Sequence, residues 1–168
     1  MTIASLPEVL APFPACSDLV SLKFDGRFLA LSFPGGTKRY PAVSGKLHGD
    51  FSPGAQKDTN RGPIPAGAFW IDPEQMWTAS RADDVIAELP YFGSYYSGWG
   101  HHRITIHVVP GTKVYGRGGF FIHGGTHQGS GGCIHVMGDG MDQFRRDLIG
   151  ALKGLPHCSG PLLVVYPK

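Results

Sequence analysis

Glycine and proline interrupt this sequence at short intervals, and this constrains the possible fold more than any other feature. The 168-residue chain contains 25 glycines and 14 prolines, scattered without an internal repeat. Both residues destabilise helix interiors, so long helices are disfavoured. Apolar residues make up 42% of the chain and charged residues only 17%, which is typical of a compact globular protein. The sequence therefore predicts one mainly β domain rich in loops.

Alternating apolar residues indicate where the strands lie. Residues 19–33 predict a hairpin that turns at Asp25-Gly26, and residues 35–45 predict a third strand. Four further segments have strand-like patterns: 67–72, 103–109, 118–124 and 161–167. Together these segments form most of the predicted core.

Two short helices are expected between the strands. Residues 80–89 begin with a Ser80-x-x-Asp83 capping pattern and stop before Pro90. Residues 139–154 place apolar side chains at helical intervals: Met141, Phe144, Leu148 and Leu152. The polar, proline-rich residues 46–66 predict a long irregular connection, a kind of segment that often borders a functional site.

The charge and the N-terminal sequence exclude some classes of function. A net charge of +2 without a stripe of Lys or Arg argues against nucleic acid as a partner. The first 18 residues lack the features of a secretory leader, and no apolar run has the length of a membrane span. We therefore expect a protein made in the cytoplasm without a signal peptide and without membrane insertion.

Three cysteines leave at least one thiol free. Cys16, Cys133 and Cys158 have no CxxC or zinc-ribbon spacing. Cys16 and Cys158 either pair in an oxidising compartment or remain two buried thiols.

Cys133 lies in the glycine-rich segment 116–136, "GRGGFFIHGGTHQGSGGCIHV". A thiol attacks as its thiolate and needs a nearby base, and His123 precedes Cys133 by one flexible loop. Gly131 and Gly132 would let the backbone approach a substrate, with the amides of Gly132 and Cys133 directed at an oxyanion. The segment predicts an acyl-transfer site around an activated sulfur.

These residues resemble the signature of the L,D-transpeptidase (YkuD-like) family, in which His-Gly is followed by a loop and then Ser/Thr-His-Gly-Cys. The resemblance assigns the general base to His123 and the nucleophile to Cys133. The short Ser-x-Gly-Cys-Ile form is most similar to the branch of type VI secretion effectors that act on peptidoglycan. The segment "RGPIPAGAFWI", residues 61–71, also resembles the family, and the similarity extends from about residue 20 to the end of the chain.

The sequence departs from that signature beside the cysteine. The loop is short, Gly131 replaces the second histidine of the motif, and His135 replaces the usual Arg or Asn. His135 is either a substitute contact to the substrate carboxylate or a structural residue. Arg117 is either an anion anchor or a solvated arginine, and Ser130 either orients His123 or the substrate or caps a turn. Gly124 is expected with these residues along the substrate-binding surface.

The resemblance implies a β-sandwich or barrel with one or two short helices, comprising residues 20–168 after an N-terminal extension of residues 1–19. It implies a cofactor-free and metal-free cysteine enzyme that acts on the tetrapeptide stems of peptidoglycan. The enzyme would cleave the bond between diaminopimelate and D-Ala, or exchange the terminal D-amino acid. As an antibacterial toxin delivered to a neighbour's periplasm by type VI secretion, it would also have a cognate immunity protein.

Two other classes of function fit parts of the sequence. His123, His127, Cys133 and His135 are potential zinc ligands of a hydrolase, although the one-residue gap between Cys133 and His135 is awkward for tetrahedral coordination. The third possibility is a wall-binding module without catalytic activity. Metal content and the reactivity of Cys133 distinguish these possibilities.

Overall fold

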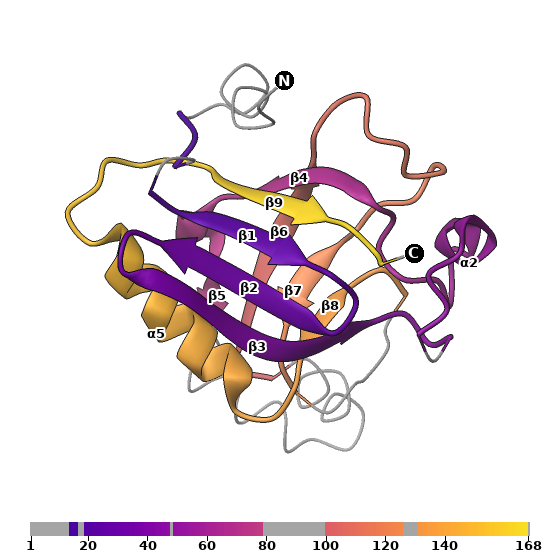
Figure 1. Cartoon of the computed structure of the whole chain (residues 1–168), viewed down its shortest axis with the longest axis horizontal. Helices are drawn as coiled ribbons and strands as arrows, with labels where there is room; N and C mark the ends of the chain where they lie inside the picture. Colours follow the sequence, from indigo (N-terminus) through magenta and orange to yellow (C-terminus); the bar gives the residue numbers. More distant parts are fainter. Residues whose placement is uncertain (1–13, 17–18, 48, 79–99, 126–130, 168) are drawn as a thin grey trace.

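The computed structural model describes residues 14–16, 19–47, 49–78, 100–125 and 131–167. Within these residues, nine strands form one sheet in the order β4-β9-β1-β2-β3-β8-β7-β6-β5. An additional pairing between β4 and β6 closes the first eight of these strands into a barrel, as Figure 1 shows. The strands are β1 (Ser21–Phe24), β2 (Phe28–Phe33), β3 (Gly36–Ser44), β4 (Gly67–Ile71), β5 (Trp77–Thr78), β6 (His102–Val108), β7 (Phe121–His123), β8 (Ile134–Val136) and β9 (Gly160–Val164).

The predicted hairpin is confirmed, and its turn shows why the chain reverses there. β1 and β2 pair antiparallel, with Phe24 opposite Leu29. The carboxylate of Asp25 accepts hydrogen bonds from the amides of Arg27 and Phe28, each 2.8 Å long. Gly26 has a φ of +95°, a conformation that side-chain-bearing residues rarely adopt. The hydrogen bonds of this turn therefore come from the local sequence.

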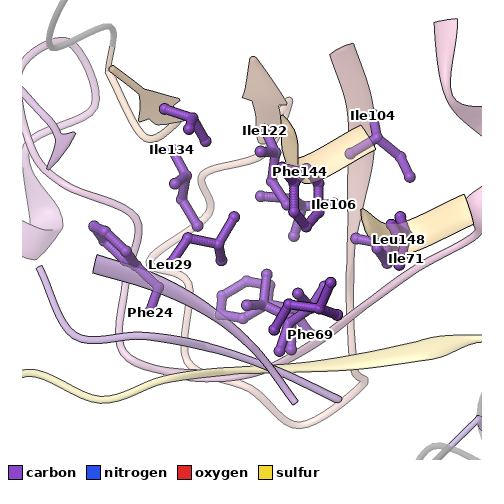
Figure 2. Close-up of a cluster of buried hydrophobic side chains, with 14 of the residues drawn as sticks. Phe24, Leu29, Phe69, Ile71, Ile104, Ile106, Ile122, Ile134, Phe144 and Leu148 are labelled. Carbon is purple, nitrogen blue, oxygen red and sulfur yellow. The ribbon is translucent and has the colours of Figure 1, made fainter. Parts of the chain in front are cut away.

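The barrel interior is filled by aliphatic and aromatic side chains from nearly all of its strands (Figure 2). Ile104 and Ile106 alternate inward from β6, as their spacing predicted. Phe69 and Phe120 meet edge to face, with ring centroids 6.0 Å apart. Other fully buried members of this core are Phe24, Leu29, Leu31, Ile64, Ile71, Ile122, Ile134, Phe144 and Leu148.

Helix α5 (Gly140–Leu152) packs beside the barrel, and its apolar face confirms the predicted helix. Met141, Phe144 and Leu148 are buried. The Phe144 ring meets Tyr40 of β3 edge to face, at a centroid distance of 5.5 Å. The Tyr40 hydroxyl then donates a 2.6 Å hydrogen bond to Asp147 on the same helix. This bond joins α5 to β3 at the edge of the core.

We expect Tyr40→Phe to lower the free energy of unfolding by about 1 kcal/mol, the typical net contribution of one hydrogen bond. The Tyr40 hydroxyl is the main cause that holds the pKa of Asp147 below its ordinary value of 3.8. A depressed folded-state pKa stabilises the protein above that ordinary value, and the stabilisation is lost as the pH falls through the folded-state pKa. The difference between wild type and variant should therefore be constant near neutral pH and shrink below about pH 4.

Urea unfolding at several pH values measures this difference. Tyr115→Phe is the matched control, because the Tyr115 ring lies near Lys57 and Lys113 and makes no hydrogen bond among the described residues. An equal loss of stability in both variants would show that the Tyr40 hydroxyl contributes nothing specific.

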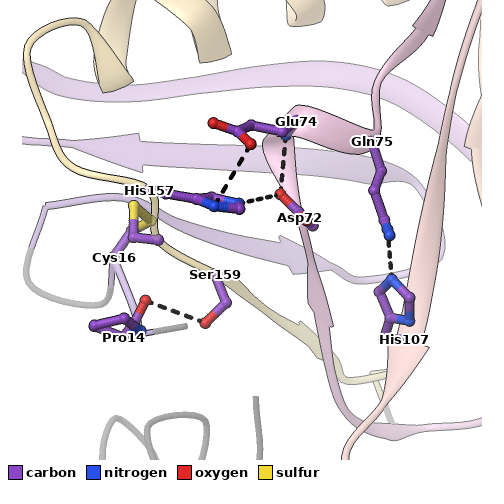
Figure 3. Close-up of polar contacts among 9 residues, drawn as sticks. Pro14, Cys16, Asp72, Glu74, Gln75, His107, His157 and Ser159 are labelled. Carbon is purple, nitrogen blue, oxygen red and sulfur yellow. Dashed lines mark hydrogen bonds and ion pairs between the residues drawn. A yellow bond between two sulfur atoms is a disulfide. The ribbon is translucent and has the colours of Figure 1, made fainter. Parts of the chain in front are cut away.

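A disulfide joins the first described residues to the segment just before β9 (Figure 3). Cys16 and Cys158 are bonded, with Cα atoms 5.2 Å apart. Ala15 forms an isolated parallel bridge with Ser159, whose amide donates a 2.8 Å bond to the carbonyl of Pro14. Of the two possibilities left open by the sequence, the structure therefore shows the paired one. The division into an extension and a catalytic domain remains a prediction.

The other predictions for individual elements have mixed outcomes. The strands near residues 35–45, 67–72, 103–109, 118–124 and 161–167 are confirmed with small shifts of their ends. Residues 46–66 are mostly irregular but contain α2 (Pro53–Lys57), where the Ser52 hydroxyl accepts from the Ala55 amide. The predicted helix 80–89 lies outside the described residues. None of the described helices has the length and apolar character required to cross a membrane.

Candidate active site

Strands β7 and β8 lie side by side in parallel and bring His123 and the start of the Cys133 strand together. Ile122 lies opposite Ile134, and His123 lies opposite His135. The two isoleucines are fully buried in the barrel core, so the alternating histidines project from the other face of the sheet. Cys133 directly precedes β8 and is two residues from His135, which brings it to the histidine face. The prediction that the loop returns the chain beside the His123 strand is confirmed.

The hydrogen bond of His123 determines which of its ring nitrogens can accept a proton. His123 is 0% exposed, and its Nδ1 lies 2.7 Å from the carbonyl oxygen of Gly124. A carbonyl only accepts, so Nδ1 carries the hydrogen and donates it. In the neutral ring, Nε2 then holds the lone pair. The backbone thus presets the tautomer that a general base requires.

Cys133 is not part of a disulfide, because the other two cysteines are bonded to each other. It is 3% exposed, and its Sγ makes a weak contact of 4.0 Å with the carbonyl oxygen of Gly119. The thiol is therefore shielded from bulk water and lies against the segment that leads into β7.

His135 lies beside His123 and away from the solvent. The two ring centroids are 5.3 Å apart at an interplanar angle of 42°. His135 is buried, its Nε2 lies 2.8 Å from the carbonyl oxygen of Gly125, and its Nδ1 has no hydrogen-bond partner among the described residues. Of the two roles left open by the sequence, this buried position favours the structural one.

Arg117 lies in the interior, so it is not the solvated arginine that was one of its two possible roles, and its role as an anion anchor stays a prediction. It is 6% exposed. Its guanidinium donates to the carbonyl oxygens of Gln56 and Pro63, at 2.6 and 2.7 Å, and to that of Gly62 at 3.0 Å. Burial is the main cause that lowers its pKa, while Asp58, Tyr166 and Cys133 act in the opposite direction.

The glycines before Cys133 allow a close approach between backbones. Gly132 has a φ of +84°, and a Cβ there would lie 2.7 Å from the Phe120 ring. A Cβ on Gly131 would lie 2.7 Å from the carbonyl oxygen of Asn60. The amide of Gly132 donates to the carbonyl of Gly62 at 3.0 Å, so it is not directed at a substrate as expected. The amide of Cys133 remains the predicted oxyanion donor.

The remaining predicted residues are less informative about the site. Gly124 packs against α5, because a Cβ there would lie 2.9 Å from Cβ of Met141. This packing supports a structural role for Gly124, and its predicted contact with substrate is untested. Ser130 and His127 lie outside the described residues.

The zinc alternative gains no support from the part of the chain that the structure describes. There, no group of three or more His, Cys, Asp or Glu side chains is arranged to hold a metal ion. His123, Cys133 and His135 belong to this part, whereas His127 does not.

Two surface features were not anticipated from the sequence. An apolar groove of about 570 Å³ lies along α2 and the end of β9 and includes Phe51, Val164 and Tyr166. A polar pocket of about 400 Å³ lies between the start of β6 and α5, where His102 Nε2 pairs with Asp142 at 3.0 Å. The sequence analysis also did not predict that the Gly62 carbonyl accepts from the amide of Gly132, directly before Cys133. The resemblance of residues 61–71 to the family was the one signal that this segment could lie near the site.

A comparison with family models identifies the family of this chain. The Tlde1 domain model matches residues 38–151, which is more than half of the chain and includes His123 and Cys133. The chain belongs to the Tlde1 domain family. Tlde1 domains are type VI effector domains with an L,D-transpeptidase-like fold, so the predicted family relationship is confirmed.

Two solved structures are distantly similar to this Tlde1 domain. Bd1075 of Bdellovibrio bacteriovorus has 17% sequence identity and a TM-score of 0.45, over 90% of this chain and 50% of that chain. L,D-transpeptidase 1 of Mycobacterium tuberculosis has 18% identity and a TM-score of 0.41, over 89% of this chain and 60% of that one. The chain thus spans about half to three fifths of the length of these proteins. No curated protein matches the sequence significantly.

Proposed function

We propose that this Tlde1 domain is a cysteine enzyme that modifies peptidoglycan, with Cys133 as nucleophile and His123 as general base. The observation that carries the proposal is the parallel pairing of β7 and β8, because His123 ends β7 and Cys133 directly precedes β8. The bond from His123 Nδ1 to the Gly124 carbonyl supports it, because in the neutral ring the lone pair is then on Nε2.

The proposed substrate is the tetrapeptide stem, at the bond between the L-centre of diaminopimelate and D-Ala. His123 Nε2 takes the thiol proton, and the sulfur attacks the carbonyl carbon to form a tetrahedral oxyanion. The imidazolium returns the proton to the departing amine, and the carbon–nitrogen bond breaks. D-Ala departs, and the rest of the stem remains bound to Cys133 as a thioester. General-base assistance of this kind contributes ~10²–10⁴-fold to the rate.

The thioester has two possible fates. If His123 deprotonates water, hydroxide attack releases a tripeptide and completes a carboxypeptidase cycle. If the amine of a free D-amino acid attacks instead, a new peptide bond forms and the terminal residue is exchanged. Both routes use the same two side chains and differ only in the acceptor.

The disulfide supports delivery to a periplasm. Structural disulfides persist in oxidising compartments, and the bacterial periplasm is one of them. A toxin of this kind would also require an immunity protein in the producing cell, and we include that partner in the proposal.

Mass spectrometry of disaccharide-tetrapeptide incubated with the protein tests the reaction, with and without an added D-amino acid. Loss of D-Ala is expected from hydrolysis, and replacement of the terminal residue is expected from exchange. A chelator should leave either product unchanged, because no step uses a metal. Absence of both products would contradict the proposed reaction and leave a wall-binding role.

A further inference from the structure

Arg117 binds two stretches of backbone, at Gln56 and at Gly62-Pro63, next to the turn that precedes Cys133. Its guanidinium donates to carbonyl oxygens at both ends of the segment 56–63. The carbonyl of Gly62 accepts from Arg117 and also from the amide of Gly132, at 3.0 Å in each case. One carbonyl oxygen therefore joins the buried cation to the residue directly before Cys133.

This arrangement leaves little room for the turn to shift. A Cβ on Gly132 would lie 3.0 Å from the Arg117 guanidinium, and a Cβ on Gly62 would lie 2.1 Å from the carbonyl oxygen of Ala55. The guanidinium also lies over the Phe120 ring, 5.8 Å from its centroid. The planar guanidinium can donate to all of these carbonyl oxygens at once, whereas the single ammonium group of a lysine would reach only some of them.

The charge of Arg117 has no close carboxylate partner among the described residues. Asp58 influences it, but that carboxylate is bound to the amides of Asn60 and Arg61 and to the Arg61 side chain. Tyr166 is also near, but burial raises the pKa of its phenol, so it is neutral at pH 7. Neutral carbonyl dipoles thus provide most of the compensation for the guanidinium.

Cys133 lies close enough to interact electrostatically with the Arg117 guanidinium. Cys133 directly follows Gly132, where a Cβ would lie 3.0 Å from the guanidinium, and Cys133 is the weakest of the three groups that raise the pKa of Arg117. Among the described residues, His123, His135 and Arg103 are the other titratable groups on the thiol's face of the sheet, and Arg103 lies opposite His123 in the β6–β7 pairing. The buried charge of Arg117 therefore adds to that of Arg103 and of any imidazolium there. Such surroundings favour a thiolate over a thiol.

We propose that Arg117 is a positioning residue for Cys133 and that its buried charge stabilises the Cys133 thiolate. The proposal rests on the proposed function, because it assumes that the thiolate is the attacking form. In this role, Arg117 acts on Cys133 through Gly62 and Gly132 and does not contact the substrate.

The charge is tested by the pH dependence of iodoacetamide alkylation of Cys133 in the wild type, Arg117→Gln and Arg117→Lys. In Arg117→Gln, we expect alkylation at pH 7 to be about tenfold slower, with an unchanged rate at high pH, since less thiolate is present. Arg117→Lys keeps a positive charge and should stay within about twofold of wild type at pH 7. Arg146→Gln removes an exposed arginine from α5 and should alter nothing.

Positioning is tested by hydrogen exchange of the Gly132 amide. In Arg117→Lys, we expect this amide to exchange at least about tenfold faster than in the wild type, because the Gly62 carbonyl loses its second donor. This readout and the alkylation profile depend on neither substrate nor turnover. A lysine variant with wild-type exchange would overturn the positioning role even if Arg117→Gln did not fold.

A folded Arg117→Gln variant with the wild-type alkylation profile would overturn the electrostatic role. If Arg117→Gln does not fold, the test rests on Arg117→Lys. A tenfold slower alkylation of Cys133 at pH 7 in the folded lysine variant would overturn the electrostatic role, and an unchanged pH profile would support it. A wild-type profile typical of an ordinary thiol, with a pKa of about 8.5, would count against the proposed nucleophile. The comparison between variants would still report on Arg117, so the two failures are distinguishable.

Discussion

Cys133→Ala is expected to abolish the release of D-Ala from tetrapeptide stems, with a loss of about 10⁴-fold or more in turnover. The reason is chemical, because alanine has no atom that can form the thioester. The side chain is 3% exposed, so its loss removes a small buried group and should leave the barrel folded. Release of D-Ala followed by mass spectrometry, beside a thermal unfolding curve, measures both properties.

His123→Ala should cause a smaller loss of about 10²–10⁴-fold, the usual contribution of a general base. His107→Ala is the matched control, because this histidine is also on a barrel strand but stacks on Trp70 and contacts Gln75. It should retain the wild-type rate. Turnover that survives in Cys133→Ala would contradict the proposed mechanism, whatever the histidine variants do.

The second large effect concerns the disulfide. Replacing Cys16 and Cys158 with serine should lower the free energy of unfolding by about 4 kcal/mol, near the upper part of the usual range. The bond closes a loop with a sequence separation of 142 residues, and long loops restrict the unfolded chain most. For a chain of this size, the melting temperature should fall by roughly 8–16 °C.

Thermal unfolding with and without dithiothreitol checks this loss without a mutation. Cys133→Ala keeps the disulfide and should lose as much stability on reduction as the wild type does. The serine double variant should not respond to the reductant. Equal melting temperatures for oxidised and reduced wild type would show that the bond does not stabilise the fold.

The sequence predicted most of the strands because their signals are local. The Asp25-Gly26 turn carries its own hydrogen bonds, and alternation in β6 follows directly from one buried and one outer face. Helix α5 was predictable for the same reason, because its apolar side chains lie on one face. Such patterns need no knowledge of distant partners.

Features that depend on distant partners were not predictable. The closure of the barrel requires β4 to pair with β6 and β9, which no local pattern specifies. The pairing of Cys16 with Cys158 was one of two possibilities until the strand order brought them together.

The candidate site divides in the same way. His123 and Cys133 were predicted from one continuous segment and a family resemblance, and the pairing of β7 with β8 brings the ends of that segment side by side. The position of Arg117 was not predictable, because its partners lie more than 50 residues away in sequence. An arginine surrounded by glycines in the sequence gives no sign that backbone carbonyls of another segment will bury it.

The central claim is that Cys133 carries the acyl group of the substrate. Rapid quenching of the protein with tetrapeptide substrate, followed by mass spectrometry of its peptides, tests this directly. We predict an adduct on the peptide that contains Cys133, with the mass of the stem minus D-Ala, and slower formation of that adduct in His123→Ala. D-Ala released with no adduct on Cys133, or with an adduct on another side chain, would contradict the account.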